Sequence, residues 1–229
     1  MLKRLLCLII CFVLLCPASN AKGESTGCSI KDTYKDYFDI SVAIEPNDLN
    51  LYPNLVNDHF NVLVTENQMK PWIHKGKDTW YWTGADAIIN YAEQHNMKIR
   101  SHTLVCPDFF DSYSKNETKW FYEDESGNSL FDENGNVVPG AQELTLERLE
   151  HHIKTIVTRY KGRIYAYDVV NEAYMENGAL RTYTKFCKLL EGVDWISMAF
   201  RWAHEADPDA VLIYNDNSFT SDILKQDVI

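Results

Sequence analysis

A short apolar run at residues 164–170 (IYAYDVV) constrains the fold more than any other feature of this sequence. It follows Gly162, which stands where a helix ends in a left-handed conformation after the basic segment 159–161. The run is short for a helix and hardly alternates, as expected for a strand covered on both faces in a parallel sheet. Asn171 and Glu172 come next. An α/β barrel places its chemistry at this end of a strand, although this stretch alone is equally consistent with a Glu172 that only caps the next helix.

The rest of the chain alternates predicted strands and helices. Strands are predicted at residues 38–43, 60–65, 98–105, 164–170 and 210–214. Helices are predicted at 48–59, around 85–92, at 146–160 and at 195–206. Five such strand–helix units in order indicate an α/β fold with a parallel sheet and helices outside it. No internal repeat is apparent, and Asn134-Gly135 predicts a small additional hairpin with a plain turn over 129–138.

Polar side chains follow four successive predicted strands. They are Glu66, Asn67 and Lys70 after the second strand, His102 on the third, Asn171 and Glu172 after the fourth, and Asn215 and Asp216 after the fifth. Each has a purely structural alternative, such as a helix cap, a core histidine or a turn. If all of them lie at one edge of the sheet, the burial of so many polar groups would destabilise the protein unless they bind a ligand. Carboxylates, amides and a lysine suit a polyhydroxylated ligand and acid/base cleavage of a glycosidic bond.

Charge and motif content exclude several other functions. The formal net charge is −11, which argues against nucleic-acid partners and anionic membrane surfaces. The sequence has no Gly-rich phosphate loop and no G-x-S-x-G turn. His151 and His152 are adjacent on a predicted helix and cannot share a metal, so we expect both on a solvated surface. We expect no cofactor and no metal.

The first 21 residues are typical of a secretory signal peptide. Lys3-Arg4 precedes the apolar segment 5–15, and small residues allow cleavage after Ala21. We therefore expect residues 22–229 to be secreted, to the extracellular space or the periplasm, with a lipoprotein anchor at Cys16 as an alternative. Of the remaining cysteines (Cys28, Cys106 and Cys187), none forms a C-x-x-C pair, which leaves buried free thiols or one bridge.

Four motifs give a specific resemblance. The motifs are T-E-N-Q-M-K-P at 65–71, R-S-H-T-L-V at 100–105, R-Y-K-G-R-I-Y-A-Y-D-V-V-N-E-A at 159–173 and L-I-Y-N-D at 212–216. From about residue 31 onward, the sequence resembles glycoside hydrolase family 10, the endo-1,4-β-xylanases. The resemblance implies a (β/α)₈ barrel that hydrolyses xylan with retention of configuration. Because only five βα units are present, we expect an incomplete TIM (β/α)₈ barrel, with residues 22–229 forming part of the catalytic domain.

The resemblance also implies roles for the residues at the strand ends. Glu172 would be the general acid/base, and Asn171 would hold the sugar 2-hydroxyl. Lys70 and His102 would line the sugar subsite at the cleavage point. The next sugar on the glycone side would be bound by Glu66 and Asn67, and Asn215 is expected at the same rim. The expected partners are xylan or xylo-oligosaccharides, bound by a monomer.

The sequence departs from the family pattern in two ways. Cys106 and Pro107 stand where the family usually has a tryptophan and a histidine, which removes an aromatic wall. The nucleophile of the family lies on strand seven in a T-E-L-D-like motif, whereas this sequence ends at Ile229. We therefore expect an incomplete sequence that is inactive alone. The alternatives are a non-catalytic carbohydrate-binding remnant of the same fold and an unrelated extracellular sugar-binding α/β protein.

Overall fold

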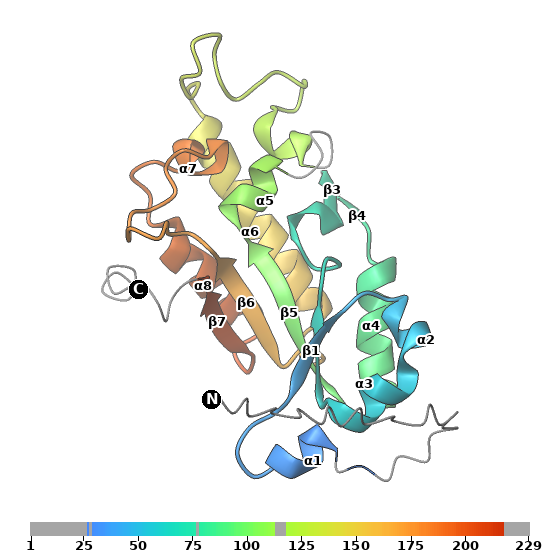
Figure 1. Cartoon of the computed structure of the whole chain (residues 1–229). Coiled ribbons are helices and arrows are strands. Elements are labelled where there is room, and N and C mark those ends of the chain that lie inside the picture. The colour runs from blue at the N-terminus through green and yellow to red at the C-terminus, as the bar shows by residue number, and fades with distance from the viewer. Residues whose placement is uncertain (1–26, 28, 77, 113–117, 218–229) are drawn as a thin grey trace, which may run out of the picture.

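The computed structural model describes residues 27, 29–76, 78–112 and 118–217 (Figure 1). The predicted signal peptide at residues 1–21 and Cys28 lie outside this part of the chain. Within the described residues, no helix has both the length and the apolar character needed to cross a membrane.

A five-stranded parallel sheet forms the centre of the molecule. Its strands are β1 (Ser41–Ile44), β2 (Val62–Thr65), β5 (Lys98–Val105), β6 (Ala166–Asn171) and β7 (Val211–Asn215). They lie in the order β1-β2-β5-β6-β7, and every neighbouring pair is parallel. The predicted α/β fold and its five strands in chain order are therefore confirmed, with boundaries shifted by a few residues.

Three long helices cover one face of this sheet. They are α4 (Thr83–Gln94), α6 (Ala141–Arg159) and α8 (Trp195–Ala206). Helix α4 packs against β2 and β5, α6 packs against β5 and α8, and α8 packs against β6 and β7 (Figure 1). All six residues of β6 are buried, which explains the nearly continuous apolar run in its sequence. Gly162 adopts the left-handed conformation predicted after the α6 helix, with φ +73°.

The predicted helix at 48–59 is two helices. Helix α2 (Asp48–Leu51) stops at Tyr52, and α3 (Pro53–His59) begins at the next residue. Proline cannot donate a backbone hydrogen bond within a helix, but its fixed φ suits the first helical position. Pro53 therefore divides the segment.

Shorter elements surround the sheet and connect its strands. Their bounds are α1 (Ile30–Tyr34), η1 (Pro71–Ile73), β3 (His74–Gly76), β4 (Thr79–Trp80), α5 (Pro107–Ser112), η2 (Lys119–Tyr122) and α7 (Lys185–Leu189). Strands β3 and β4 form a separate antiparallel pair. Elements η1 and α5 follow β2 and β5, so they lie at the end of the sheet where the predicted site residues stand.

The predicted placement of His152 on a solvated surface is wrong. Its side chain is fully buried, and Nε2 lies 3.1 Å from the carbonyl oxygen of Leu104. Its Nδ1 lies 3.4 Å from Nδ1 of His74, on strand β3. The buried face of α6 repeats every three or four residues and includes position 152, whereas the neighbouring His151 is half exposed. Burial lowers the pKa of His152 well below its ordinary value, and His74 adds to the shift.

The segment before α6 contains two similar turns, a short repeat that the sequence analysis missed. Asp124 accepts hydrogen bonds from the backbone N–H groups of Ser126 and Asn128. Asp132 accepts the same pair, from Asn134 and Asn136. The sequences 124–128 (DESGN) and 132–136 (DENGN) explain the likeness, because each places the acid four residues before an asparagine. The predicted plain turn at 134–135 is confirmed, with Phe131 and Val137 bridged across it.

Candidate active site

Four of the predicted site residues line one cavity at the C-terminal ends of the strands. The cavity has a volume of about 260 Å³, and its lining includes Glu66, Lys70, His102 and Asn215. The side chains come from β5, β7 and the segment after β2. Parallel strands bring their carboxyl ends to the same edge of a sheet, and the predicted convergence there is confirmed for these four residues.

Asp168 joins the side chains on the floor of this cavity. Its Oδ2 lies 2.8 Å from Nδ1 of His102, and its Oδ1 accepts a hydrogen bond of 2.9 Å from Nε of Arg100. The carboxylate is only 1% exposed, so the two partners compensate a buried charge. Arg100 and His102 are two residues apart on β5 and therefore point to the same face.

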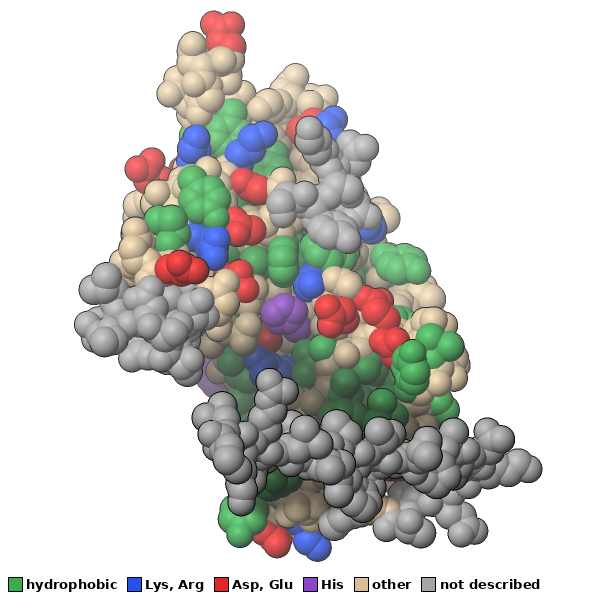
Figure 2. Space-filling model, viewed as in Figure 1, with side chains coloured by type: hydrophobic (Ala, Val, Ile, Leu, Met, Phe, Trp, Pro, Cys, Tyr) green, Lys and Arg blue, Asp and Glu red, His purple; other side chains and the backbone are tan. Residues whose placement is uncertain are grey.

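Sequence reasoning missed Asp168 and Arg100 as site residues. Asp168 lies inside the apolar run at 164–170, which was used only to predict a strand. A carboxylate is rarely buried without a charged partner, so an aspartate inside such a run was itself the signal. The face of the sheet opposite the helices carries this polar group, and Figure 2 shows a histidine at its centre with basic, acidic and hydrophobic side chains around it.

Asn171 and Asn215 continue the hydrogen-bond chain toward Glu172. Nδ2 of Asn215 donates to Oδ1 of Asn171 at 2.7 Å, and Nη2 of Arg100 donates to Oδ1 of Asn215 at 3.0 Å. Nδ2 of Asn171 lies 3.5 Å from the sulfur of Cys106. Five side chains are thus linked from the tip of β6 to His102 on β5, which fixes the orientation of both amides.

Glu172 follows the last residue of β6 and adopts a left-handed backbone, with φ +51°. Its N–H donates to the carbonyl oxygen of Asn215 at 2.9 Å, which continues the pairing of β6 with β7. Left-handed conformations are uncommon for residues other than glycine and concentrate at functional sites. The side chain is about one-third exposed, and Oε2 lies 3.7 Å from Nη2 of Arg181.

Arg181 links Glu172 to a second carboxylate. Its Nη1 donates to Asp108 at 2.9 Å and lies 2.7 Å from the hydroxyl of Tyr183. The arginine stands in the loop after β6, and Asp108 stands in α5, after β5. Neither residue was predicted from the sequence, because ion pairs between distant loops leave no local pattern.

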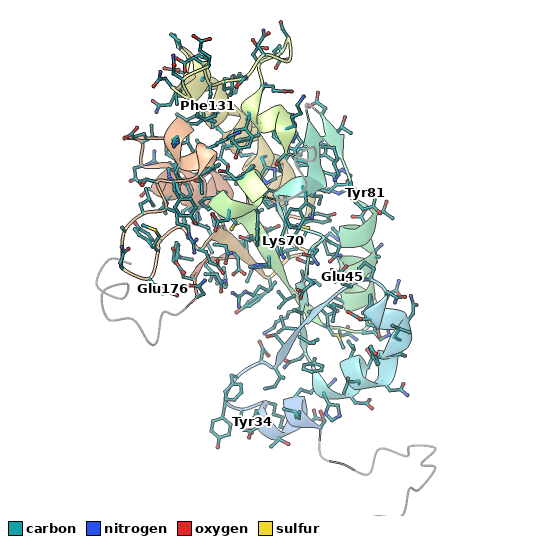
Figure 3. The ribbon with its side chains drawn as sticks, turned by 45° about the horizontal axis from the view of Figure 1, so that its top comes forward. Tyr34, Glu45, Lys70, Tyr81, Phe131 and Glu176 are labelled. Atoms are coloured by element: carbon teal, nitrogen blue, oxygen red, sulfur yellow. The ribbon has the colours of Figure 1, made fainter. Side chains whose placement is uncertain are left out.

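Asn67 and Lys70 contact each other in the segment between β2 and η1. Nζ of Lys70 donates to Oδ1 of Asn67 at 2.8 Å. The amides of Asn67 and Gln68 both donate to the carboxylate of Glu45, another residue that the sequence analysis missed. Glu45 directly follows β1, so it stands at the same end of the sheet as the predicted residues. In Figure 3, Lys70 and Glu45 lie near each other, while Glu176 stands apart on the loop after β6.

The buried cysteines agree with the interpretation of free thiols for the two that the structure describes. Cys106 and Cys187 are free and buried. Burial raises the pKa of each thiol to about 11. Among the residues described, no group of three or more His, Cys, Asp or Glu side chains could hold a metal ion.

This arrangement combines a carboxyl group at the tip of β6 with hydrogen-bonding groups from β5, β7 and the segment after β2. Glu172 does not line the cavity of about 260 Å³, but its backbone pairs with Asn215, which does. Its side chain is partly exposed and could exchange a proton with a bound molecule. The amides, Lys70 and His102 offer donors and acceptors for hydroxyl groups. A larger cavity of about 540 Å³ between β3, η2 and α6 shares no lining residue with this site.

Comparison with known proteins identifies the family. The model of glycosyl hydrolase family 10 matches residues 29–229. The chain belongs to glycosyl hydrolase family 10. It is 37% identical over 228 residues to the β-1,4-xylanase of Dictyoglomus thermophilum, covering 97% of this chain and 56% of that protein. It is 36% identical over 213 residues to endo-1,4-β-xylanase A of Xylanibacter ruminicola, covering 91% and 52%. The chain spans about half the length of these curated relatives.

Solved family 10 structures confirm the fold. The intracellular xylanase TsXylA of Thermoanaerobacterium saccharolyticum, in a complex with xylotriose, aligns with a TM-score of 0.74 at 32% identity. The alignment covers 90% of this chain and 61% of that one. The open sheet of five parallel strands therefore corresponds to the N-terminal part of a TIM barrel, as the sequence predicted.

Proposed function

We propose that this chain carries the acid/base half of the active site of a secreted, retaining endo-1,4-β-xylanase. Glu172 is the general acid/base, and Asn171 holds the sugar 2-hydroxyl. Lys70 and His102 line the subsite at the cleavage point, with Asn215 beside them. Glu66 and Asn67 bind the next sugar on the glycone side. The substrate is xylan or xylo-oligosaccharides.

One observation carries this proposal. Glu172 stands at the tip of β6 in a left-handed conformation, and its backbone is paired with Asn215. Asn215 is in turn linked through Arg100 and Asp168 to His102. Family membership supports the reaction class, and the named relatives are xylanases. The complex of TsXylA with xylotriose supports the substrate class.

The proposed reaction begins with Glu172 protonated. The carboxylic acid gives its proton to the glycosidic oxygen as the bond to the leaving sugar breaks. A second carboxylate attacks the anomeric carbon from the other face, about 5–5.5 Å from the first. The resulting carboxylate of Glu172 then takes a proton from water, which hydrolyses the glycosyl-enzyme intermediate.

The second carboxylate belongs to a T-E-L-D-like motif in the family pattern, and these 229 residues contain no such motif. We therefore propose that residues 22–229 bind xylo-oligosaccharides but do not hydrolyse xylan by themselves. Secretion through the signal peptide at residues 1–21 remains part of the proposal. The second candidate is a carbohydrate-binding protein of the same fold, which needs the site residues but no acid/base.

The test compares two substitutions in a chain extended with a family 10 C-terminal portion. Glu172→Gln should reduce xylan hydrolysis by a factor of about 10² to 10⁴. It should reduce hydrolysis of aryl xylosides with good leaving groups much less, because these need little protonation. Glu176→Gln, on the same loop, is the matched control and should change neither rate.

Equal losses on the two substrate types would reject the acid/base role of Glu172. Xylotriose binding without hydrolysis in the extended chain would favour the carbohydrate-binding alternative. Release of reducing sugar from xylan by the unextended chain would show that the account of the second carboxylate is wrong.

A further inference from the structure

Two aromatic side chains, Trp72 and Phe109, stand beside Lys70 at the margin of the strand-end cavity. Trp72 belongs to η1 and Phe109 to α5. Their ring centroids are 5.5 Å apart, with the planes at 55° to each other. Nζ of Lys70 lies 4.8 Å from the centroid of Phe109 and 5.5 Å from that of Trp72. Lys70 lines the cavity and contacts both rings, so it links the aromatic pair to the cavity, although neither ring is itself a lining residue.

Neither ring belongs to the buried core. Their neighbours Ile73 and Phe110 are at most 1% exposed and account for the packing of η1 and α5. Trp72 and Phe109 each keep part of their surface accessible. Large aromatic side chains that remain partly exposed at the edge of a polar cavity are typical of ligand sites.

The position that directly follows β5 offers no such surface. Cys106 is fully buried and contacts the amide of Asn171. The aromatic surface next to Lys70 therefore comes from η1 and α5, the short helices that follow β2 and β5. Two segments far apart in sequence supply it, since η1 follows β2 and α5 follows β5.

The chemistry of the neighbourhood suits one sugar ring. A pyranose has apolar C–H faces and a polar rim of hydroxyl groups. The aromatic rings offer an apolar surface, and the ammonium of Lys70 and the side chain of Asn67 offer hydrogen bonds within reach of the rim. The two rings also hold the ammonium by cation–π attraction, so its position is fixed before a ligand arrives.

We propose that Trp72 and Phe109 form a stacking subsite for one unbranched xylose residue beside Lys70. This inference rests on the proposed function. It gives the chain an aromatic wall in place of the one that is absent at Cys106, and it makes Trp72 and Phe109 binding residues for the xylan chain.

The test is the affinity of the full chain for xylotriose and xylotetraose, measured by calorimetric titration. Trp72→Ala and Phe109→Ala should each weaken binding about tenfold. Phe109→Tyr should keep the affinity, because it retains the ring. Phe109→Leu should lose it, because leucine fills a similar volume without an aromatic face. Tyr37→Ala is the matched control, since Tyr37 is 81% exposed and lies before β1.

The outcomes separate this inference from the function on which it rests. If the unaltered chain binds and Phe109→Leu binds equally well, a packing role is enough and the stacking subsite is rejected. If the unaltered chain does not bind either oligosaccharide, the proposed function fails, and the inference fails with it. Thermal unfolding of every variant identifies any that do not fold, and Trp72→Leu and Phe109→Leu then replace the alanine variants.

Discussion

Nδ1 of His102 lies 2.8 Å from Oδ2 of Asp168, and Asp168 is buried. A ring nitrogen held by a carboxylate fixes the orientation of the imidazole and leaves Nε2 as the nitrogen that can face a ligand. The same carboxylate holds Arg100, whose guanidinium reaches Asn215. Asp168 therefore positions side chains on β5 directly and Asn215 on β7 through Arg100, although it lies in the middle of β6.

Substitution of Asp168 should lower the stability of the folded protein. Asp168→Asn removes the negative charge that both Arg100 and His102 contact, and it should lower the free energy of unfolding by about 1–3 kcal/mol. This loss is smaller than for a fully buried ion pair, because the Arg100 and His102 side chains are 31% and 21% exposed. Urea unfolding measures the change.

The control for this substitution is Asp39→Asn. Asp39 pairs with Lys98 at 2.6 Å, but both side chains are well exposed, at 39% and 48%. The loss should be at most about 1 kcal/mol. Equal losses for Asp168→Asn and Asp39→Asn would contradict the importance of burial at Asp168.

Lys70 should contribute to oligosaccharide binding. Lys70→Met keeps most of the side-chain volume but removes the ammonium that lines the cavity and contacts Asn67. We expect the affinity for xylotriose to fall about tenfold, as for the loss of one hydrogen bond to a charged group. Lys161→Met, in the exposed turn after α6, should leave the affinity unchanged. An unchanged affinity in Lys70→Met would remove Lys70 from the site.

The buried His152 should make stability depend on pH. Its folded-state pKa is depressed by burial, whereas an unfolded histidine has a pKa of about 6.5. Below about pH 6.5 the unfolded chain binds a proton that the folded chain does not, so the free energy of unfolding falls as the pH decreases. The slope is at most about 1.4 kcal/mol per pH unit, and the contribution is constant above this range.

Urea unfolding between pH 7.5 and 5 checks this slope. His152→Gln keeps a donor for the carbonyl of Leu104 but cannot titrate, so its stability should vary less with pH. His151→Gln is the control, because its ring is half exposed. Identical pH dependence in the unaltered chain and His152→Gln would show that His152 does not cause the effect.

Substitution of Gly162 should destabilise the protein through the backbone conformation alone. A Cβ at this position would have no atom within 4 Å, and φ is +73°. Gly162→Ala should therefore cost about 1 kcal/mol from the left-handed conformation. Gly162→Asn should cost less, since asparagine tolerates this region better. Thermal unfolding would refute the explanation if the alanine and asparagine variants lost the same stability.

Local patterns in the sequence were sufficient for much of the fold. The run at 164–170 predicted β6, and residues 98–105 and 195–206 match β5 and α8 as the structure has them. These elements depend on interactions between residues close in sequence and on their hydrophobic period. The order of parallel strands followed from the alternation of strands and helices. That order by itself places Glu66, Lys70, His102 and Asn215 at one rim.

The remaining features depended on contacts between distant residues. An aspartate inside an apolar run signals a buried charge, but its partners are known only once β5 and β6 are in register, with His102 opposite Asp168. His152 is buried because α6 places that position against Leu104 and His74. Arg181 reaches Asp108 and Glu172 only through the folded loop after β6. The sequence alone therefore determined the strand–helix order and the side chains at the strand ends, because neighbouring residues specify both. Only the tertiary structure decided which partners hold those side chains, since hydrogen bonds and burial depend on distances between segments that are remote in the chain.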